Sequence, residues 1–126
     1  MAPRDRSRPG LPADAAPVRT MTVSAEHHGR DVVLTATGEL DQSTSPKLSR
    51  LIRLALVDQP RRLVLDLSQL RFINSSGLGL LASTHRETAP AQLRVVAGTV
   101  VRRLLSVTDL LDMLTVHTSL EEALAS

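Results

Sequence analysis

The order of apolar and polar residues changes period several times along the chain. Apolar residues alternate with hydroxyl residues over 21–25, and 31–38 alternates again. Alternation of this kind is typical of half-buried strands. Because the intervening His28-Gly29 pair offers a turn, the pattern predicts an antiparallel hairpin at the start of the domain.

Helical spacing follows the hairpin. Leu48, Leu51, Ile52 and Ala55 fall at i, i+3, i+4 and i+7, which predicts one buried stripe on a helix. A hydroxyl residue before a proline is a typical helix start, so Thr44 or Ser45 is expected to cap this helix and Pro46 to lie in its first turn. Pro60 marks the end of the region.

Three later stretches also predict helices. The first begins near Ser75 or Ser76 and runs to about Glu87, with Leu78, Leu81, Ala82 and a partly buried His85 on its inner face. The second, 99–108, begins at Gly98 or Thr99 and has Val101, Leu104 and Leu105 inward and Arg102 and Arg103 in water. The last, 119–126, opens with the capping-box spacing of Ser119 and Glu122.

Strands are predicted between these helices. The apolar run at 62–67 is typical of a strand covered on both faces, so it belongs in the middle of a sheet. Residues 92–97 predict another strand and 114–117 a short edge strand. Because helices alternate with strands, the pairing is mostly parallel. The expected fold is a single α/β domain with a mixed four- to five-stranded sheet, about four helices and an N-terminal β-hairpin.

Parallel pairing brings two distant loops together. The strand ending at Gly38 and the strand ending near Leu67 are joined by one helix, so the loops that follow them emerge at the same end of the sheet. We therefore expect Asp41 and Ser75 to be neighbours.

The second of these loops places hydroxyl residues where a helix begins. Free N–H groups and the helix dipole at such a position favour an anion, and Gly77 and Gly79 leave room for close approach. However, Asn74, Ser75 and Ser76 are also good capping residues. The spacing alone leaves both interpretations open, a helix cap or a place for a phosphate.

Composition narrows the function classes. The chain has 126 residues, with one Phe and no Trp, Tyr or Cys, so stacking on single-stranded nucleic acid is disfavoured and thiolate chemistry is excluded. Residues 1–20 contain four Arg and two Asp. The remaining 106 residues carry 11 basic and 11 acidic side chains, so they have no net positive charge that would attract nucleic acid. We expect 1–19 to be a disordered Arg- and Pro-rich leader, and 20–126 to be the domain. Without a membrane span or signal peptide, the expected location is the cytoplasm.

Enzymatic alternatives find little support. The stretch around Ser75 lacks the G-x-S-x-G motif of a serine hydrolase. Among the histidines, only His117 remains open as a catalytic base for this serine. His27-His28 has no spaced carboxylate partner for a metal. Because the chain shows neither a P-loop nor a G-x-G-x-x-G motif, no cofactor is expected.

The same residues resemble a known family. Residues 38–48, 61–81 and the closing segments are similar to the STAS domain of bacterial anti-sigma factor antagonists, and the likeness covers about 20–126. Its central motif is a strand ending D-x-S, a short apolar loop, then D-S-S-G-x-G opening a helix. The resemblance implies a non-enzymatic antagonist that binds an anti-sigma factor with serine kinase activity and releases a sigma factor. It also implies that the kinase phosphorylates Ser75 and that a phosphatase reverses the modification.

The resemblance further implies a partner-binding surface around this helix start. Its residues are Asp41, Asn74, Ser75, Ser76, Gly77, Leu78 and Leu80, with Leu80 expected to be exposed. One residue departs from the family pattern, because Asn74 stands where an Asp is usual. If that carboxylate is needed for phosphorylation, the protein is a persistently active antagonist. The alternative function, from another class, is a STAS accessory or interaction subunit of a transport or signalling complex that is never phosphorylated.

Overall fold

The computed structural model describes residues 20–125, and the expectation of a disordered leader at 1–19 lies outside them. The strands are β2 (Met21–His28), β3 (Asp31–Leu40), β4 (Arg62–Ile73), β5 (Gln92–Val96) and β6 (Val116–His117). The helices are α1 (Ser45–Val57), α2 (Ser75–Glu87), α3 (Thr99–Val107), α4 (Leu110–Met113) and α5 (Leu120–Leu124).

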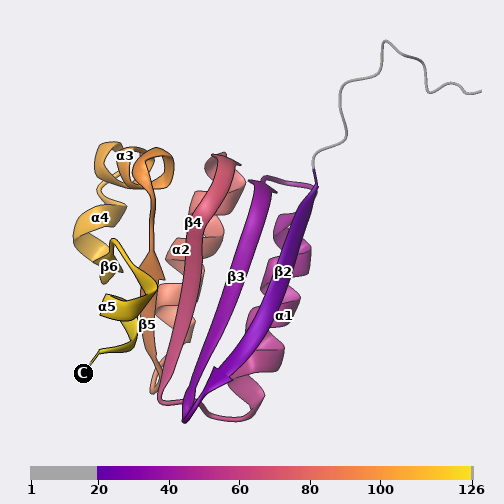
Figure 1. Ribbon diagram of the computed structural model, residues 1–126. Coiled ribbons are helices and arrows are strands. Elements are labelled where there is room, and N and C mark those ends of the chain that lie inside the picture. Colours follow the sequence, from indigo (N-terminus) through magenta and orange to yellow (C-terminus); the bar gives the residue numbers. More distant parts are fainter. Residues whose placement is uncertain (1–19, 126) are drawn as a thin grey trace, which may run out of the picture.

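The strands form one mixed sheet in the order β2-β3-β4-β5-β6 (Figure 1). β2 pairs with β3 antiparallel, whereas every later pair is parallel. The predicted fold class, the hairpin, the central position of β4 and the short edge strand β6 are confirmed. The hairpin turn falls at Gly29 and Arg30, one residue later than predicted, and Gly29 takes the left-handed φ of +63° that such a turn favours.

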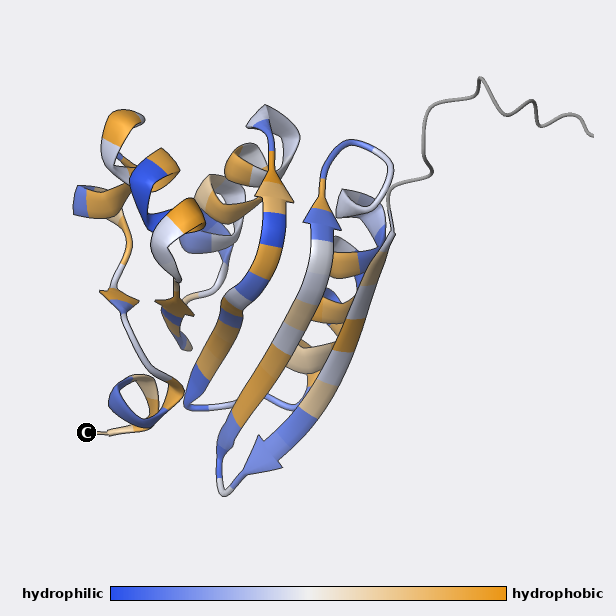
Figure 2. Ribbon diagram, turned by 45° about the horizontal axis from the view of Figure 1, so that its top comes forward, coloured by the Kyte–Doolittle hydropathy of each residue, from blue (hydrophilic) through white to orange (hydrophobic). Residues whose placement is uncertain are grey.

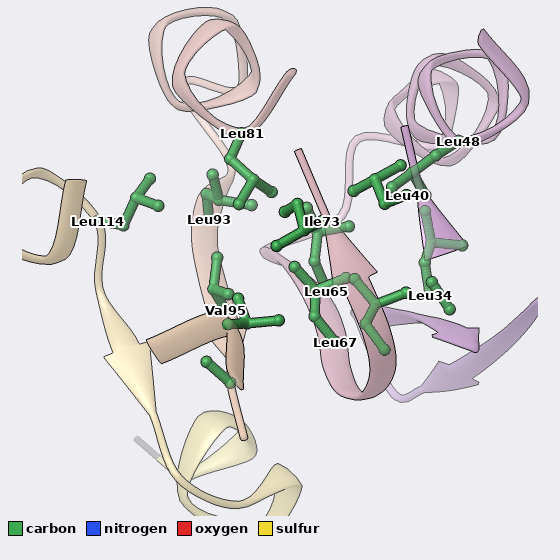
Figure 3. Packing of buried hydrophobic residues seen from close by; sticks show 14 of the residues in the cluster. Leu34, Leu40, Leu48, Leu65, Leu67, Ile73, Leu81, Leu93, Val95 and Leu114 are labelled. Atoms are coloured by element: carbon green, nitrogen blue, oxygen red, sulfur yellow. The ribbon is translucent and has the colours of Figure 1, made fainter. Parts of the chain in front are cut away.

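Helices on one face of the sheet enclose most of the core. α1 contributes Leu48 and Ile52, α2 contributes Leu81, and these pack on Leu34, Leu65 and other inward strand residues (Figure 3). The opposite face is covered over a smaller area by α5, where Ala123 packs on Val33, Val64 and Val96. Apolar bands along β3 and β4 in Figure 2 follow from this double cover.

The inner face of α2 differs from the predicted one. Gly77, Leu81 and Thr84 are its buried residues, while Leu78 and Ala82 are half-buried. His85 is exposed, so the expectation of a partly buried histidine is wrong. The cause is that Gly77 and Thr84 occupy inner positions on either side of Leu81, so the most buried line of the helix passes through 77, 81 and 84 and leaves His85 outside it.

Both strands that lead to the candidate site are longer than predicted. β3 continues to Leu40 and β4 to Ile73, so the loop between β4 and α2 is reduced to Asn74. β4 gains this length through two irregularities opposite β3, one of them between Asp66 and Gln69. There the Asp66 carboxylate accepts hydrogen bonds from the Ser68 backbone N–H (3.1 Å) and hydroxyl (2.7 Å), which stabilises the bulge.

Residues 20–125 contain neither a membrane-spanning helix nor a cluster of metal-ligating side chains. No helix there has the length and apolar character needed to cross a bilayer. No group of three or more His, Cys, Asp or Glu side chains in the same range is arranged to hold a metal ion.

Candidate functional site

The candidate site lies where β3 and β4 end side by side. Leu40 and Ile73 are paired across the two strands, and the Asn74 N–H donates to the Leu40 carbonyl at 3.2 Å. The residues after Leu40 and Ile73 therefore meet at one edge, where Asp41, Gln42, Ser43 and Asn74 line a shallow hollow. The two loops share an end of the sheet, as the parallel topology predicts (Figure 1).

The Asp41 side chain stabilises its own loop. Its Oδ1 accepts hydrogen bonds from the Ser43 hydroxyl at 2.8 Å, the Ser43 N–H at 2.9 Å and the Thr44 N–H at 3.1 Å. The Ser43 hydroxyl is the largest influence, and together with the backbone donors it holds the pKa of the Asp41 carboxyl below its usual value. Asp41 is thus ionised at neutral pH, and with only 7% of its surface exposed it fixes the turn that faces α2.

Asn74 is the N-cap of α2. Its Oδ1 accepts hydrogen bonds from the Ser76 N–H at 3.0 Å and the Gly77 N–H at 3.3 Å. The cap is therefore supplied by Asn74, and neither Ser75 nor Ser76 is needed for it. Ser75 is the first residue of the helix and is exposed, while Ser76 is half-buried.

The next residues of α2 divide between packing and surface. Gly77 is buried, and a Cβ there would come within 2.7 Å of Ile73 Cγ1 and 2.8 Å of Leu40 Cγ. It therefore sets how closely α2 approaches the strand ends. Leu78 is half-buried and packs on the core. Leu80 is also half-buried against the core, so the expectation of an exposed Leu80 is wrong.

Sequence reasoning missed a polar group on the other side of the same edge. Glu39 accepts hydrogen bonds from the Thr20 N–H at 3.0 Å and from Arg71 Nε at 3.1 Å, so it ties the start of β2 to β4 across β3. Lys47 of α1 donates to the Met21 carbonyl at 3.1 Å. The only signal for Glu39 in the sequence is its place in the G-E-L-D segment that precedes the Asp41 turn.

This arrangement fits a surface site for covalent modification better than a catalytic site. Asp41 Oδ1 accepts hydrogen bonds from its own turn, and these lower the pKa of the carboxyl, which makes it a weak base for the Ser75 hydroxyl. Ser75, in contrast, is exposed at the tip of a helix whose backbone is capped by its neighbour. A group added to Ser75 would change the charge of this edge without entering the core.

Comparison with known proteins agrees with this architecture. The chain is 34% identical over 107 residues to the anti-sigma-F factor antagonist RsfB of Mycobacterium tuberculosis, covering 83% of this chain and 88% of that protein. A crystal structure of an anti-sigma factor antagonist from Mycobacterium paratuberculosis superposes with a TM-score of 0.79 at 34% identity, covering 83% of this chain and 92% of the other.

More distant structures share the fold. The phosphorylated form of the Bacillus cell fate determinant SpoIIAA superposes with a TM-score of 0.62 at 22% identity, covering 80% of this chain and 96% of that one. The model of the STAS domain family matches residues 22–123, nearly all of the described domain. With that match and its relatives at 34% identity, the chain belongs to the STAS domain family.

Proposed function

We propose that this protein is a cytoplasmic, non-enzymatic anti-sigma factor antagonist. It binds an anti-sigma factor with serine kinase activity, frees a sigma factor, and is switched off when that kinase phosphorylates Ser75. A phosphoserine phosphatase restores the active form. Two relatives at 34% identity carry the name anti-sigma factor antagonist, which supports the class of partner.

The observation that carries the switch is the exposure of Ser75 beside the ionised Asp41 turn. The paired strand ends put Asn74 about 5 Å from the Asp41 turn, one strand spacing, and Ser75 is the next residue. A phosphate adds about −1.5 to −2 charges at neutral pH. Two like charges at one packed contact oppose binding of a partner, whereas the same phosphate in the free protein stays in solvent.

The surface that would meet the partner includes the Asp41 turn, Asn74 and the exposed side of the first turn of α2. Ser75 and Ser76 provide its polar contacts, and the exposed backbone at Gly79 leaves room beside them. Gly77, Leu78 and Leu80 support this surface from below, since all three pack against the strand ends or the core.

Intact mass after incubation with a cognate anti-sigma kinase and ATP tests the switch. We expect a gain of one phosphate that is lost in Ser75→Ala and kept in Ser76→Ala, the matched control from the adjacent position. A gain that persists in Ser75→Ala would place the modification elsewhere. The partner itself is identified by a pull-down with the unmodified protein.

Asn74 favours one second candidate, a STAS interaction subunit that is not phosphorylated. Asn74 provides the cap through its amide oxygen, but it offers no carboxylate to a kinase that reaches Ser75. This candidate predicts tight binding to a partner kinase with no change of mass. Asn74→Asp distinguishes a slow switch from an absent one, because a carboxylate at this position keeps the cap and would speed the phosphorylation of a slow substrate.

A further inference from the structure

One side of the sheet ends in β2, and the outer side of this strand is long and regular (Figure 1). Its pairing with β3 runs through all eight residues without a register shift, and its sequence contains no proline. The opposite side of the sheet ends in β6, which has only two residues. An outer strand as long as β2 favours pairing with a further strand unless charge, proline or a bulge prevents it.

The register shows which backbone groups of β2 point away from β3. In an antiparallel pair, alternate residues direct their N–H and C=O groups toward the partner strand. The Glu39 N–H donates to the Thr20 carbonyl at 2.9 Å, so the even-numbered residues of β2 face β3 in this way. The odd-numbered residues therefore direct their backbone groups outward, away from the sheet.

A lysine covers one end of this outer side. Lys47 of α1 donates to the outward Met21 carbonyl at 3.1 Å. The outward N–H and C=O groups of Val23, Ala25 and His27, in contrast, make no hydrogen bond within residues 20–125. We call residues 23–27 the β2 edge, and Ala25 is its centre.

An apolar side chain of α1 lies beside the β2 edge. Leu54 follows Lys47 by seven residues, close to two helical turns, so both side chains point to the side of α1 that lies over β2. Leu54 is about 10 Å further along α1 than Lys47, and Ala25 is about 13 Å along β2 from Met21. Because α1 leads back from the end of β3 to the start of β4, it runs in the direction of β2. Leu54, which is 60% exposed, is therefore about level with Ala25.

We propose that the β2 edge binds a second copy of this chain, with the two β2 strands antiparallel and a two-fold axis at Ala25. Val23 then pairs with His27 of the second copy, and Ala25 pairs with its own counterpart. Every outward N–H and C=O group of the β2 edge gains a hydrogen bond in this arrangement. The two Leu54 side chains meet beside the axis and lose their exposure to water.

Charge and existing hydrogen bonds favour this register over its neighbours. With the axis at Ala25, Glu26 lies opposite Ser24 of the second copy. An axis at Glu26 would place two carboxylates opposite each other, which is destabilising. An axis at Ser24 would use the Met21 carbonyl, which already accepts from Lys47. The β2 edge is therefore complementary to itself in one register, which favours a second copy over an unrelated strand.

The dimer leaves the proposed partner-binding surface open. Antiparallel pairing turns the two copies end to end, so their Asp41 turns and Ser75 residues lie at opposite ends of one continuous sheet. The dimer thus carries two separate sites for partners. The inference stands on the β2 edge alone and does not depend on what binds at those sites.

Sedimentation equilibrium of the full chain tests the interface. We expect the mean mass to rise with concentration from that of one chain and to level at two. Leu54→Glu places two carboxylates beside the axis and should weaken the dimer about tenfold or more. Val107→Glu adds the same charge to α3 on the β5 side of the sheet, where Val107 is 71% exposed, and should dimerise like the parent (Figure 1). A parent that stays monomeric, or equal weakening in both variants, overturns the inference.

Cross-linking tests the position of the axis. The chain has no cysteine, and directly opposed residues of a hydrogen-bonded antiparallel pair have Cα atoms about 5.5 Å apart, which a disulfide can span. Ala25→Cys should therefore give a disulfide-linked dimer under mild oxidation with copper phenanthroline. Thr22→Cys is the control, because Thr22 is exposed and its counterpart would lie about 20 Å away. Equal cross-linking of both variants, or of neither, contradicts the proposed pairing.

Discussion

Gly77 is the residue that fixes the distance between α2 and the ends of β3 and β4. The Cβ of an alanine would lie within 2.8 Å of the buried side chains of Leu40 and Ile73, which have little room to move. We expect Gly77→Ala to lower the free energy of unfolding by about 1–3 kcal/mol, since overpacking outweighs the gain in helix propensity. Urea denaturation measures this change.

Gly79 is the matched control for Gly77, because it lies in the same helix with nothing within 4 Å of an added Cβ. Gly79→Ala should raise the free energy of unfolding by about 0.5–1 kcal/mol through helix propensity alone. Similar changes of the same sign in both variants would show that backbone preference, not close packing, governs Gly77.

Asp41 gives the stability of the domain a dependence on pH. Its pKa is lowered in the folded protein, chiefly by the Ser43 hydroxyl, so the unfolded chain binds the proton more readily. The contribution is fully present above the unfolded pKa of about 3.9 and is lost as the pH falls through the lower folded value. The difference in unfolding free energy between parent and Asp41→Asn should therefore be constant near pH 7 and shrink below about pH 4. A difference that grows on acidification contradicts this account.

At the residue scale, the location of the site is predictable from the sequence, whereas the hydrogen bonds that its side chains make are not. The meeting of the Asp41 loop with the start of α2 follows from parallel topology, which the alternation of strands and helices already specifies. Two features of the site depend on local hydrogen bonds that competing residues could equally have made. The Asp41 carboxylate accepts from Ser43 and Thr44, and Asn74 caps α2. Spacing does not decide between such neighbours.

At the scale of elements, the boundaries and buried faces predicted from the sequence are wrong where buried or strand-forming residues are not apolar. The buried stripe of α2 uses Gly77 and Thr84, which hydropathy does not mark as core residues. Gly77 is buried because α2 packs closely on Leu40 and Ile73. The last part of β4 contains Ser68, Gln69 and Arg71, which suggested a loop, but a bulge held by Asp66 continues the strand to Ile73. α4 has only four residues, too few for a helical period to be visible.

α5 illustrates an element held by charged side chains. Its last carbonyls accept hydrogen bonds from Arg94 Nη1, at 3.1 Å to Ala123 and 2.6 Å to Ala125, and from Arg62 Nη1 at 2.7 Å to Leu124. Arg62 is itself buried in an ion pair with Asp31 at 2.9 Å. These contacts attach a five-residue helix that could not persist alone.

Replacing one of these arginines should therefore loosen α5 without unfolding the sheet. Hydrogen bonds from a charged donor contribute about 1.5–3 kcal/mol, so Arg94→Gln should reduce amide protection in α5 by about tenfold or more. Protection in β3 and β4 should stay as in the parent. The control is Arg102→Gln, which removes an exposed arginine from α3. Uniform loss of protection across the sheet would show instead that α5 and the sheet unfold as one unit.

At the scale of the whole molecule, the fold separates the proposed switch from the core. Apolar side chains pack on both faces of the sheet, and Figure 3 shows part of the larger cluster. Ser75, in contrast, is exposed and belongs to neither cluster. Charge at that position can therefore change with little cost to stability. This separation follows from parallel topology, which brings the loops at the carboxyl ends of the strands to one edge, away from the two faces of the sheet that form the core.

Ser75→Glu tests that separation. Because Ser75 is exposed in the first turn of α2, a carboxylate there interacts favourably with the helix dipole, and the melting temperature should stay within a few degrees of the parent. Affinity for the anti-sigma factor should fall about tenfold or more, since the new charge meets the partner beside the ionised Asp41 turn. Val57→Glu adds the same charge at the exposed far end of α1, where side-chain exposure is 73%, and should keep the parent's affinity. Titration calorimetry measures the affinity of both variants for the anti-sigma factor. Equal losses of affinity would show that net charge alone weakens binding. Unfolding of Ser75→Glu would show that position 75 is structural, and the proposed switch would then have no site.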